Sequence, residues 1–210
     1  KEKKSDVVIS AGNTGALLVI SKLNLNMIEN IDKPALSALW PNKKGMSVVL
    51  DLGANIECSP KNLIDFSIMG SSLFKSLYPN DIPKVALLNI GSEELKGNEI
   101  IKETYQQLNK RKNHDFEFKG YIEGNQLMNG DVNVIVADGF TGNVALKTAE
   151  GTASFITSEL KKAMTGNIIG KISSLLNISN LRKFKARLDP RLYNGAIFIG
   201  LDSPVIKSHG

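Results

Sequence analysis

Four short segments of the sequence combine glycine with asparagine, threonine or aspartate, and such residues could bind an anion. The segments are residues 10–15 (SAGNTG), 51–55 (DLGAN), 89–98 (NIGSEELKGN) and 138–143 (DGFTGN). Glycine lets the backbone come close to a ligand, and the first amides of a helix point outward with a partial positive charge. The pattern therefore predicts a site for a small anion, with phosphate as the expected ligand.

The candidate donors in these segments are backbone amides, side-chain amides and hydroxyls. They fall into two sets of three consecutive residues, Asn13, Thr14 and Gly15, and Thr141, Gly142 and Asn143, with Asn55 and Asn89 as further side-chain amides. Asp51 and Asp138 are open to two interpretations, because an aspartate can cap a helix or orient a lysine or amide, whereas its charge would repel phosphate. The simpler alternative is that all these residues only end strands and start helices.

Three lysines are candidate cations for the same anion. Lys96 lies in a short polar stretch before Gly97, and Lys207 lies two residues before His209. Lys147 follows Asn143 by one helical turn, and its apolar neighbours favour a binding site or a salt bridge, since an unpaired buried lysine is costly. The alternative for each is an ordinary solvated surface charge, and His209 could donate to a substrate or merely cap the chain end.

Other common chemistries find little support in the sequence. Cys58 is the single cysteine and the histidines are His114 and His209, so a cysteine-histidine nucleophile is a poor candidate and Cys58 is expected to be a small buried residue. The sequence has no G-x-S-x-G, H-E-x-x-H, G-x-x-x-x-G-K-[ST] or G-x-G-x-x-G motif. We expect no metal and no cofactor.

The elements that must position these segments alternate along the chain. Apolar β-branched runs predict strands at residues 7–10, 47–51, 84–89, 116–121, 132–138 and 196–201. Helical patterns lie between them at residues 14–26, 59–77, 99–110 and 144–164, the second starting with Ser59 as cap and Pro60 as first helical residue. This alternation predicts a three-layer α/β/α fold with an open, mostly parallel sheet, whose carboxyl edge gathers the four segments.

Length and charge limit the class of protein. The 210 residues, 42% hydrophobic and 22% charged, predict one globular domain over residues 1–210, and both ends look cut from a longer chain. A lone cysteine and the lack of a long apolar stretch or secretory signal favour the cytoplasm. The net charge is +5, and basic residues cluster at 160–191. This cluster lacks interleaved aromatic residues of the kind that stack on bases, so nucleic acid is not an expected partner.

In order and spacing, five motifs resemble the phosphate acyltransferases of bacterial phospholipid synthesis, the PlsX family. They are S-A-G-N-T-G-A, D-L-G-A-N, L-N-I-G-x-E-E-x-K-G-N, A-D-G-F-T-G-N-V-x-L-K and P-V-I-K-x-H-G, and the resemblance spans nearly the whole chain. It implies an enzyme that transfers a fatty acyl group from acyl carrier protein to inorganic phosphate. It also implies a fold like that of phosphate acetyltransferases and isocitrate-type dehydrogenases, a homodimer, and peripheral contact with the inner face of the cell membrane.

Such a reaction needs cations and amides that hold phosphate and an oxyanion, but no protein nucleophile. On the matching motifs, the expected catalytic residues are Lys96, Asn143, Lys207 and His209. The expected substrate-binding residues are Asn13, Thr14, Gly15, Asp51, Asn55, Asn89, Gly97, Asn98, Asp138, Gly139, Thr141, Gly142 and Lys147. By the same comparison the chain lacks an amino-terminal portion and a short carboxyl-terminal tail.

Residues 160–190 are expected to form an amphipathic helical arm. Apolar residues recur there at spacings of three and four between lysines and arginines, while Gly166, Gly170 and Asn177 favour two helices over one rod. The apolar face could pack on the body or a twin subunit, or insert shallowly into an anionic membrane surface. The basic face could receive the acidic acyl carrier protein.

Two other functions remain open at this point. A phosphate acetyltransferase-like enzyme that uses acyl coenzyme A could share the fold and the phosphate segments. A non-catalytic membrane-surface module would rest on the basic arm alone.

Overall fold

A computed structural model describes residues 5–111, 115–188 and 195–208 of the chain. The chain forms two compact units, one of residues up to Asn143 together with the segment after residue 194, and one that begins at Val144. The first unit holds the sheet and its flanking helices. The second unit is helical, and it includes the segment in which the sequence predicts an arm.

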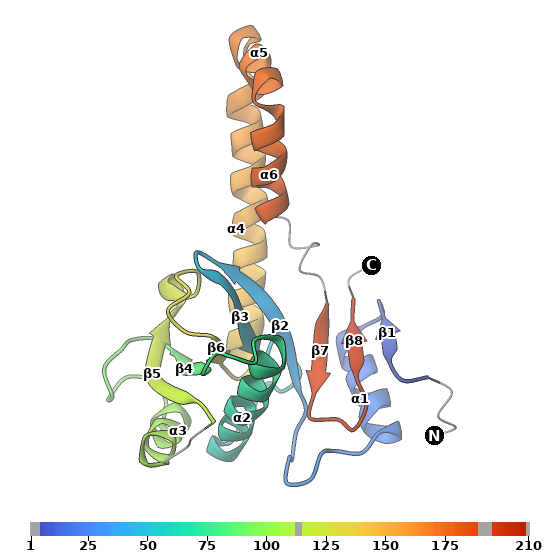
Figure 1. The fold of residues 1–210 in the computed structure, drawn as a ribbon, viewed down its shortest axis with the longest axis vertical. Coiled ribbons are helices and arrows are strands. Elements are labelled where there is room, and N and C mark those ends of the chain that lie inside the picture. Colours follow the sequence, from blue (N-terminus) through green and yellow to red (C-terminus); the bar gives the residue numbers. More distant parts are fainter. Residues whose placement is uncertain (1–4, 112–114, 189–194, 209–210) are drawn as a thin grey trace. The chain divides into compact units, whose positions relative to one another are not determined.

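The elements of the first unit form one sheet with flanking helices (Figure 1). Its strands are β1 (Val8–Ser10), β2 (Ala35–Asn42), β3 (Gly45–Leu50), β4 (Lys84–Asn89), β5 (Glu117–Glu123), β6 (Val134–Val136), β7 (Ala196–Ile199) and β8 (Val205–Lys207). Its helices are α1 (Thr14–Asn24), α2 (Pro60–Leu77), α3 (Glu99–Lys110), the short 3-10 helix η1 (Gly124–Gln126) and the first residues of α4 (Gly139–Thr165).

The strand order is β1-β8-β7-β2-β3-β6-β4-β5. Strands β3, β6, β4 and β5 are parallel to one another, as are β1 and β8. Strand β2 runs antiparallel to β3 and β7, and β7 runs antiparallel to β8. The predicted α/β fold with a mostly parallel sheet is therefore confirmed. Strands β2 and β8 were not among the predicted elements.

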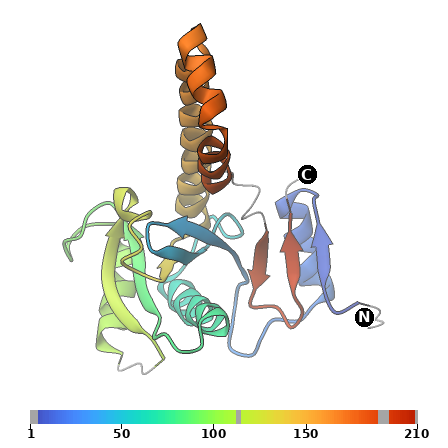
Figure 2. The same cartoon turned by 45° about the horizontal axis from the view of Figure 1, so that its top comes forward.

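The core lies between the parallel strands and helices α2 and α3 (Figure 2). Strands β3, β4 and β6 bury residues on both faces, and the alternate residues of one face pack with Leu63, Phe66 and Phe74 of α2. Gly70 allows this close packing, because a Cβ there would lie 2.6 Å from Cγ1 of Val134. Ser59 caps α2 and Pro60 is its first residue, as the sequence predicts.

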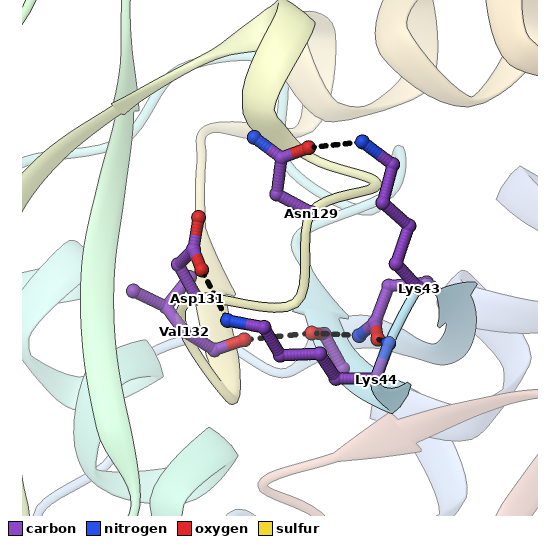
Figure 3. Close-up of polar contacts among 7 residues, drawn as sticks. Lys43, Lys44, Asn129, Asp131 and Val132 are labelled. Carbon is purple, nitrogen blue, oxygen red and sulfur yellow. Dashed lines mark hydrogen bonds and ion pairs between the residues drawn. The ribbon is translucent and has the colours of Figure 1, made fainter.

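The turn between β2 and β3 is fixed to residues 128–132 by a set of polar contacts that we call the hairpin clasp (Figure 3). Lys43 Nζ donates to Asn129 Oδ1 at 2.9 Å, and Lys44 pairs with Asp131. In the same turn the Asn42 side chain donates to Ser47 Oγ, which donates to the carbonyl of Val132. The clasp joins the amino ends of β3 and β6.

The second unit consists of the rest of α4, α5 (Ile168–Leu176) and α6 (Ile178–Leu188), and α6 runs back beside α4 in both views (Figures 1 and 2). Asn167 caps α5, and Ser174 Oγ donates to the carbonyl of Met164. Many large apolar side chains of this unit are exposed, including Ile168, Ile169, Leu175 and Leu176. Among the described residues, no helix is both long and apolar enough to cross a membrane.

Candidate active site at the strand ends

Asp51 is a buried acceptor that shapes the loop after β3. Its Oδ1 accepts from the amides of Leu36, Gly53 and Ala54, and its Oδ2 accepts from the amide and the side chain of Asn55 at 2.7 Å each. Burial raises the pKa of the Asp51 carboxyl, while these hydrogen bonds act in the opposite direction. With these five donors, Asp51 holds the loop after β3 in shape, and its role toward a substrate stays a prediction.

The loop after β3 contacts the start of α4 directly. The amide of Gly139 donates to the carbonyl of Asn55 at 2.7 Å, and a Cβ at Gly142 would lie 1.9 Å from the Asp51 carbonyl oxygen. A Cβ at Gly53, whose φ is +127°, would lie 3.2 Å from Nδ2 of Asn143. Only glycine fits at position 142, so two of the four predicted segments come together through their backbones.

Asp138 caps α4, and its carboxylate offsets the partial positive charge at the start of that helix. Its carboxylate accepts from the amide of Thr141 at 2.8 Å and from the Thr141 hydroxyl at 2.7 Å. The Thr141 amide and hydroxyl are therefore not free to donate to a ligand. A negatively charged cap is a poor neighbour for phosphate, so the start of α4 is less suited to the anion than the sequence pattern indicates.

The third segment, residues 89–98, lies beside the first two. In the parallel register Leu87 pairs with Val136, which pairs with Leu50, so the three strands end side by side. Asn89 is buried and donates to the carbonyls of Gly91 and Lys96, while Asn98 caps α3. Gly97 has φ +94°, and a Cβ there would lie 2.5 Å from Oδ1 of Asn89. Asn89, Gly97 and Asn98 thus shape this loop.

The fourth segment, residues 10–15, follows a strand of the opposite direction. Since β1 and β8 run antiparallel to β3, β4 and β6, their carboxyl ends lie at the other edge of the sheet. The prediction that all four segments follow parallel strands at one carboxyl edge is therefore wrong for residues 10–15. The alternation of strands and helices along the sequence predicts parallel strands. This pattern does not reveal the antiparallel strand β2 or the short terminal strand β8.

Residues 10–15 and Lys207 form a second, less acidic group. The amide of Ser208 donates to the carbonyl of Ser10, which places Lys207 of β8 beside the end of β1. Asn13 caps α1 by accepting from the amide of Ala16 at 3.0 Å, and the first turn of α1 contains no acidic residue. Within the described part of the chain, the amides of Thr14 and Gly15 form no hydrogen bond.

The remaining candidates differ in their surroundings. Lys207 is 8% exposed and its ammonium donates to the carbonyl of Ser208, whereas Lys96 is exposed. Lys147 is exposed and pairs with Glu150 at 2.7 Å, which is the salt bridge that the sequence left as one alternative. Asn143 is exposed beside Gly53, and His209 lies outside the described residues.

Cys58 is a buried packing residue, as expected. Its side chain is 6% exposed and belongs to the core cluster. Burial, with smaller contributions from Asp51 and Asp138, raises the pKa of the thiol to about 11. A thiol with such a pKa is a weak nucleophile at neutral pH. No group of three potential metal-binding side chains occurs within the described ranges.

Two residues of this region carry no sequence signal. The amide of Leu36 donates to Asp51, and the carbonyl of Pro34 accepts from the Asn55 side chain at 2.7 Å. Both groups are backbone atoms at the start of β2, so their contribution depends on tertiary pairing and not on residue type.

Comparison with known proteins identifies the family. A family model described as "Fatty acid synthesis protein" matches residues 1–210. The chain belongs to this family. Among curated members, the chain is 92% identical over 210 residues to a protein named "Phosphate acyltransferase" from Pelagibacter ubique, and it covers 63% of that protein. It is 44% identical over 211 residues to a protein of the same name from Maricaulis maris, of which it covers 60%. The chain thus spans about three fifths of the length of these family members.

Solved structures show the same fold at low identity. A phosphotransacetylase from Streptococcus pyogenes aligns with a TM-score of 0.60 and 16% identity, over 98% of this chain and 58% of the other. A branched-chain phosphotransacylase from Enterococcus faecalis aligns with a TM-score of 0.57 and 14% identity, over 97% and 67% of the two chains. The likeness confirms the fold that the sequence predicts for this fatty acid synthesis protein.

Proposed function

We propose that the full-length protein is a phosphate acyltransferase that transfers a fatty acyl group from acyl carrier protein to inorganic phosphate. Membership of the fatty acid synthesis family and relatives named phosphate acyltransferase support the reaction class. The structural observation that carries the proposal is the pairing of a buried lysine with an unblocked helix start, Lys207 beside residues 10–15.

The proposal places phosphate at the start of α1. The free amides of Thr14 and Gly15 point along the helix dipole, the cap is the neutral Asn13, and Lys207 supplies positive charge. The start of α4, with the Asp138 carboxylate already bound, is the weaker anion site. Residues 13–15 and residues 141–143 lie at opposite ends of the sheet, so the expectation that one phosphate lies between them is wrong within one chain.

The reaction is an attack by a phosphate oxygen on the thioester carbonyl carbon. A carbon-oxygen bond forms, the carbon-sulfur bond breaks, and the carrier thiol leaves with the proton that hydrogen phosphate gives up. Lys96 and Asn143, on exposed loops at the opposite end of the sheet from residues 10–15, are the proposed donors to the developing oxyanion in a site that a twin subunit completes. Asp51, Asn55 and Asn89 hold these loops in shape. No residue needs to act as nucleophile, consistent with the buried thiol of Cys58.

The partners belong to the proposal as well. Exposed apolar side chains on α5 and α6 support an interface with a twin subunit or peripheral contact with an anionic membrane surface. Lys171, Arg182, Lys183 and Lys185 on the same helices provide a basic surface for acyl carrier protein. We propose the cytoplasm, including the inner face of the membrane, as the location.

The test uses the full-length protein with a long-chain acyl-acyl carrier protein, phosphate and a direct assay of acyl phosphate. We expect Lys207→Gln to lower kcat/KM for phosphate by about 100-fold, since it removes a charge-assisted contact with the reacting anion. Lys185→Gln is the matched control and should leave the KM for phosphate unchanged.

Other outcomes would favour the alternatives. Turnover with short-chain acyl coenzyme A and none with the carrier-bound substrate would indicate a phosphate acetyltransferase-like enzyme. Unaltered acyl phosphate formation by Lys207→Gln would remove the proposed role of this residue. No acyl phosphate from the unmodified full-length protein with either acyl donor would favour the non-catalytic membrane-surface module.

A further inference from the structure

The loop that carries Lys96 is fastened on its inner side by Asn89. The side-chain amide of Asn89 donates to the carbonyls of Gly91 and Lys96 at 3.1 Å each. The left-handed backbone at Gly97 then brings the chain against the same side chain, leaving no room for a Cβ. These contacts fix the two ends of the loop, and within its outer part the amide of Lys96 donates to the carbonyl of Glu93 at 2.9 Å.

The outer part of the loop is held by a tyrosine from α3. The hydroxyl of Tyr105 donates to Oε1 of Glu94 at 2.8 Å. The ring of Tyr105 lies against β5, with centroid distances of 4.8 Å to Tyr121 and 5.6 Å to Phe118. Gly120, at φ +81°, leaves room for the ring, since a Cβ there would lie 3.3 Å from Cε2 of Tyr105. Tyr105 thus connects the sheet to the loop.

The carboxylate of Glu94 is thereby engaged two residues from Lys96. Among the described residues, the Lys96 ammonium forms no ion pair and no hydrogen bond, and the side chain is exposed. An acidic side chain so close in sequence is a natural competitor for the lysine. Its bond to Tyr105 leaves the ammonium available for an anionic substrate.

We propose that Tyr105 is a positioning residue that, through Glu94, fixes the loop of residues 91–97 and keeps Lys96 available to the substrate. This inference rests on the role given to Lys96 in the proposed function. Tyr105 lies on α3 behind the loop, and it acts only through Glu94.

The structure offers a matched control in the adjacent tyrosine. Tyr121 stacks on Tyr105, but its hydroxyl is buried and has no hydrogen-bond partner within the described part of the chain. Tyr105→Phe and Tyr121→Phe each remove one hydroxyl from the same aromatic cluster. Only the first removes a bond to the loop.

The experiment compares these two variants in the full-length protein by amide hydrogen exchange and by acyl phosphate kinetics. We expect Tyr105→Phe to speed exchange at residues 91–97 by about fivefold and to lower kcat/KM by a similar factor, the size of one lost hydrogen bond. Tyr121→Phe should change neither quantity. Equal exchange in Tyr105→Phe and in the unmodified protein would overturn the proposal.

Substitutions at Glu94 separate positioning from a general loss of stability. Glu94→Gln keeps an acceptor for the Tyr105 hydroxyl and should retain slow exchange, whereas Glu94→Ala should speed exchange at residues 91–97 as much as Tyr105→Phe does. Combining Tyr105→Phe with Glu94→Ala should speed exchange at residues 91–97 no more than either change alone, because both changes remove the same contact. Fully additive effects in the double variant would contradict the proposed contact between Tyr105 and Glu94.

Lys96→Gln distinguishes this inference from the proposed function. We expect it to lower activity while exchange at residues 91–97 stays slow. Full activity of Lys96→Gln would remove the catalytic role of Lys96, and the exchange of Tyr105→Phe would still decide whether Tyr105 holds the loop.

Discussion

At the scale of single residues, the two aspartates show how the same residue type takes two different positions in one site. Asp51 is fully buried and accepts hydrogen bonds from five donors, while Asp138 is partly buried and caps a helix. The sequence left both aspartates open to two interpretations, and it did not reveal that the Asp138 carboxylate already accepts from Thr141 at the start of α4.

The first prediction concerns the contact between Gly142 and Asp51. Gly142→Ala would place a Cβ 1.9 Å from the Asp51 carbonyl oxygen, so the start of α4 must shift. We expect the free energy of unfolding to fall by about 3 kcal/mol or more, in the range of severe overpacking. Gly151→Ala is the control in the same helix, where a Cβ meets nothing within 4 Å. It should stabilise the protein by about 0.5 kcal/mol. Urea unfolding of both variants measures the difference, and equal stabilities would contradict the contact.

The second prediction is a pH dependence from Cys58. Burial raises the pKa of its thiol from 9.0 to about 11, so between these values the folded protein keeps a proton that the unfolded chain releases. Stability from this group is complete below pH 9 and is lost as the pH rises toward 11. Cys58→Ala should therefore lose less unfolding free energy across this range than the unmodified protein. Parallel slopes in urea unfolding at several pH values would show that the thiol ionises normally.

At the scale of elements, the sequence predicted the strands and helices around the buried motifs well. The bounds of β4 and α3 agree with the predicted 84–89 and 99–110, because each is bounded by clear caps or turns. Strand β2 was missed because prolines flank and end its short apolar run, and β8 because it is only three residues long. These two strands reverse the direction of β1, which local patterns cannot reveal. The location of residues 10–15 was therefore beyond sequence reasoning.

The third prediction tests the hairpin clasp as an element that fixes β2 and β3. Gly130 has φ +76°, and a Cβ there would lie 2.5 Å from Oδ1 of Asn42. Gly130→Ala should therefore lower the free energy of unfolding by about 1–3 kcal/mol through backbone strain and the lost Asn42 contact. Gly124→Ala is the control, since its Cβ meets nothing within 4 Å and its φ is ordinary. A thermal unfolding midpoint that falls equally in both variants would indicate no specific role for the clasp.

At the scale of the whole molecule, the two units differ in how they bury apolar side chains. The first unit encloses a continuous core of strands β3, β4 and β6 with α2 and α3. In the second unit, α5 has no buried residue, and large side chains such as Ile169 and Leu176 are 80% and 82% exposed. Soluble domains seldom expose so many adjacent apolar residues unless a partner covers them. The sequence predicted this amphipathic pattern but not which partner covers it.

The last prediction identifies that partner. We expect Ile169→Gln combined with Leu176→Gln to weaken self-association of the full-length protein, because a twin subunit would lose two apolar anchors at its interface. Lys171→Gln combined with Lys183→Gln is the matched control on the same two helices, and it should leave self-association intact while weakening binding to acyl carrier protein at low salt. Sedimentation velocity measures the first effect, and carrier binding at two salt concentrations measures the second. Unchanged sedimentation of the apolar variant, together with loss of its binding to anionic lipid vesicles, would instead assign the exposed face to the membrane surface.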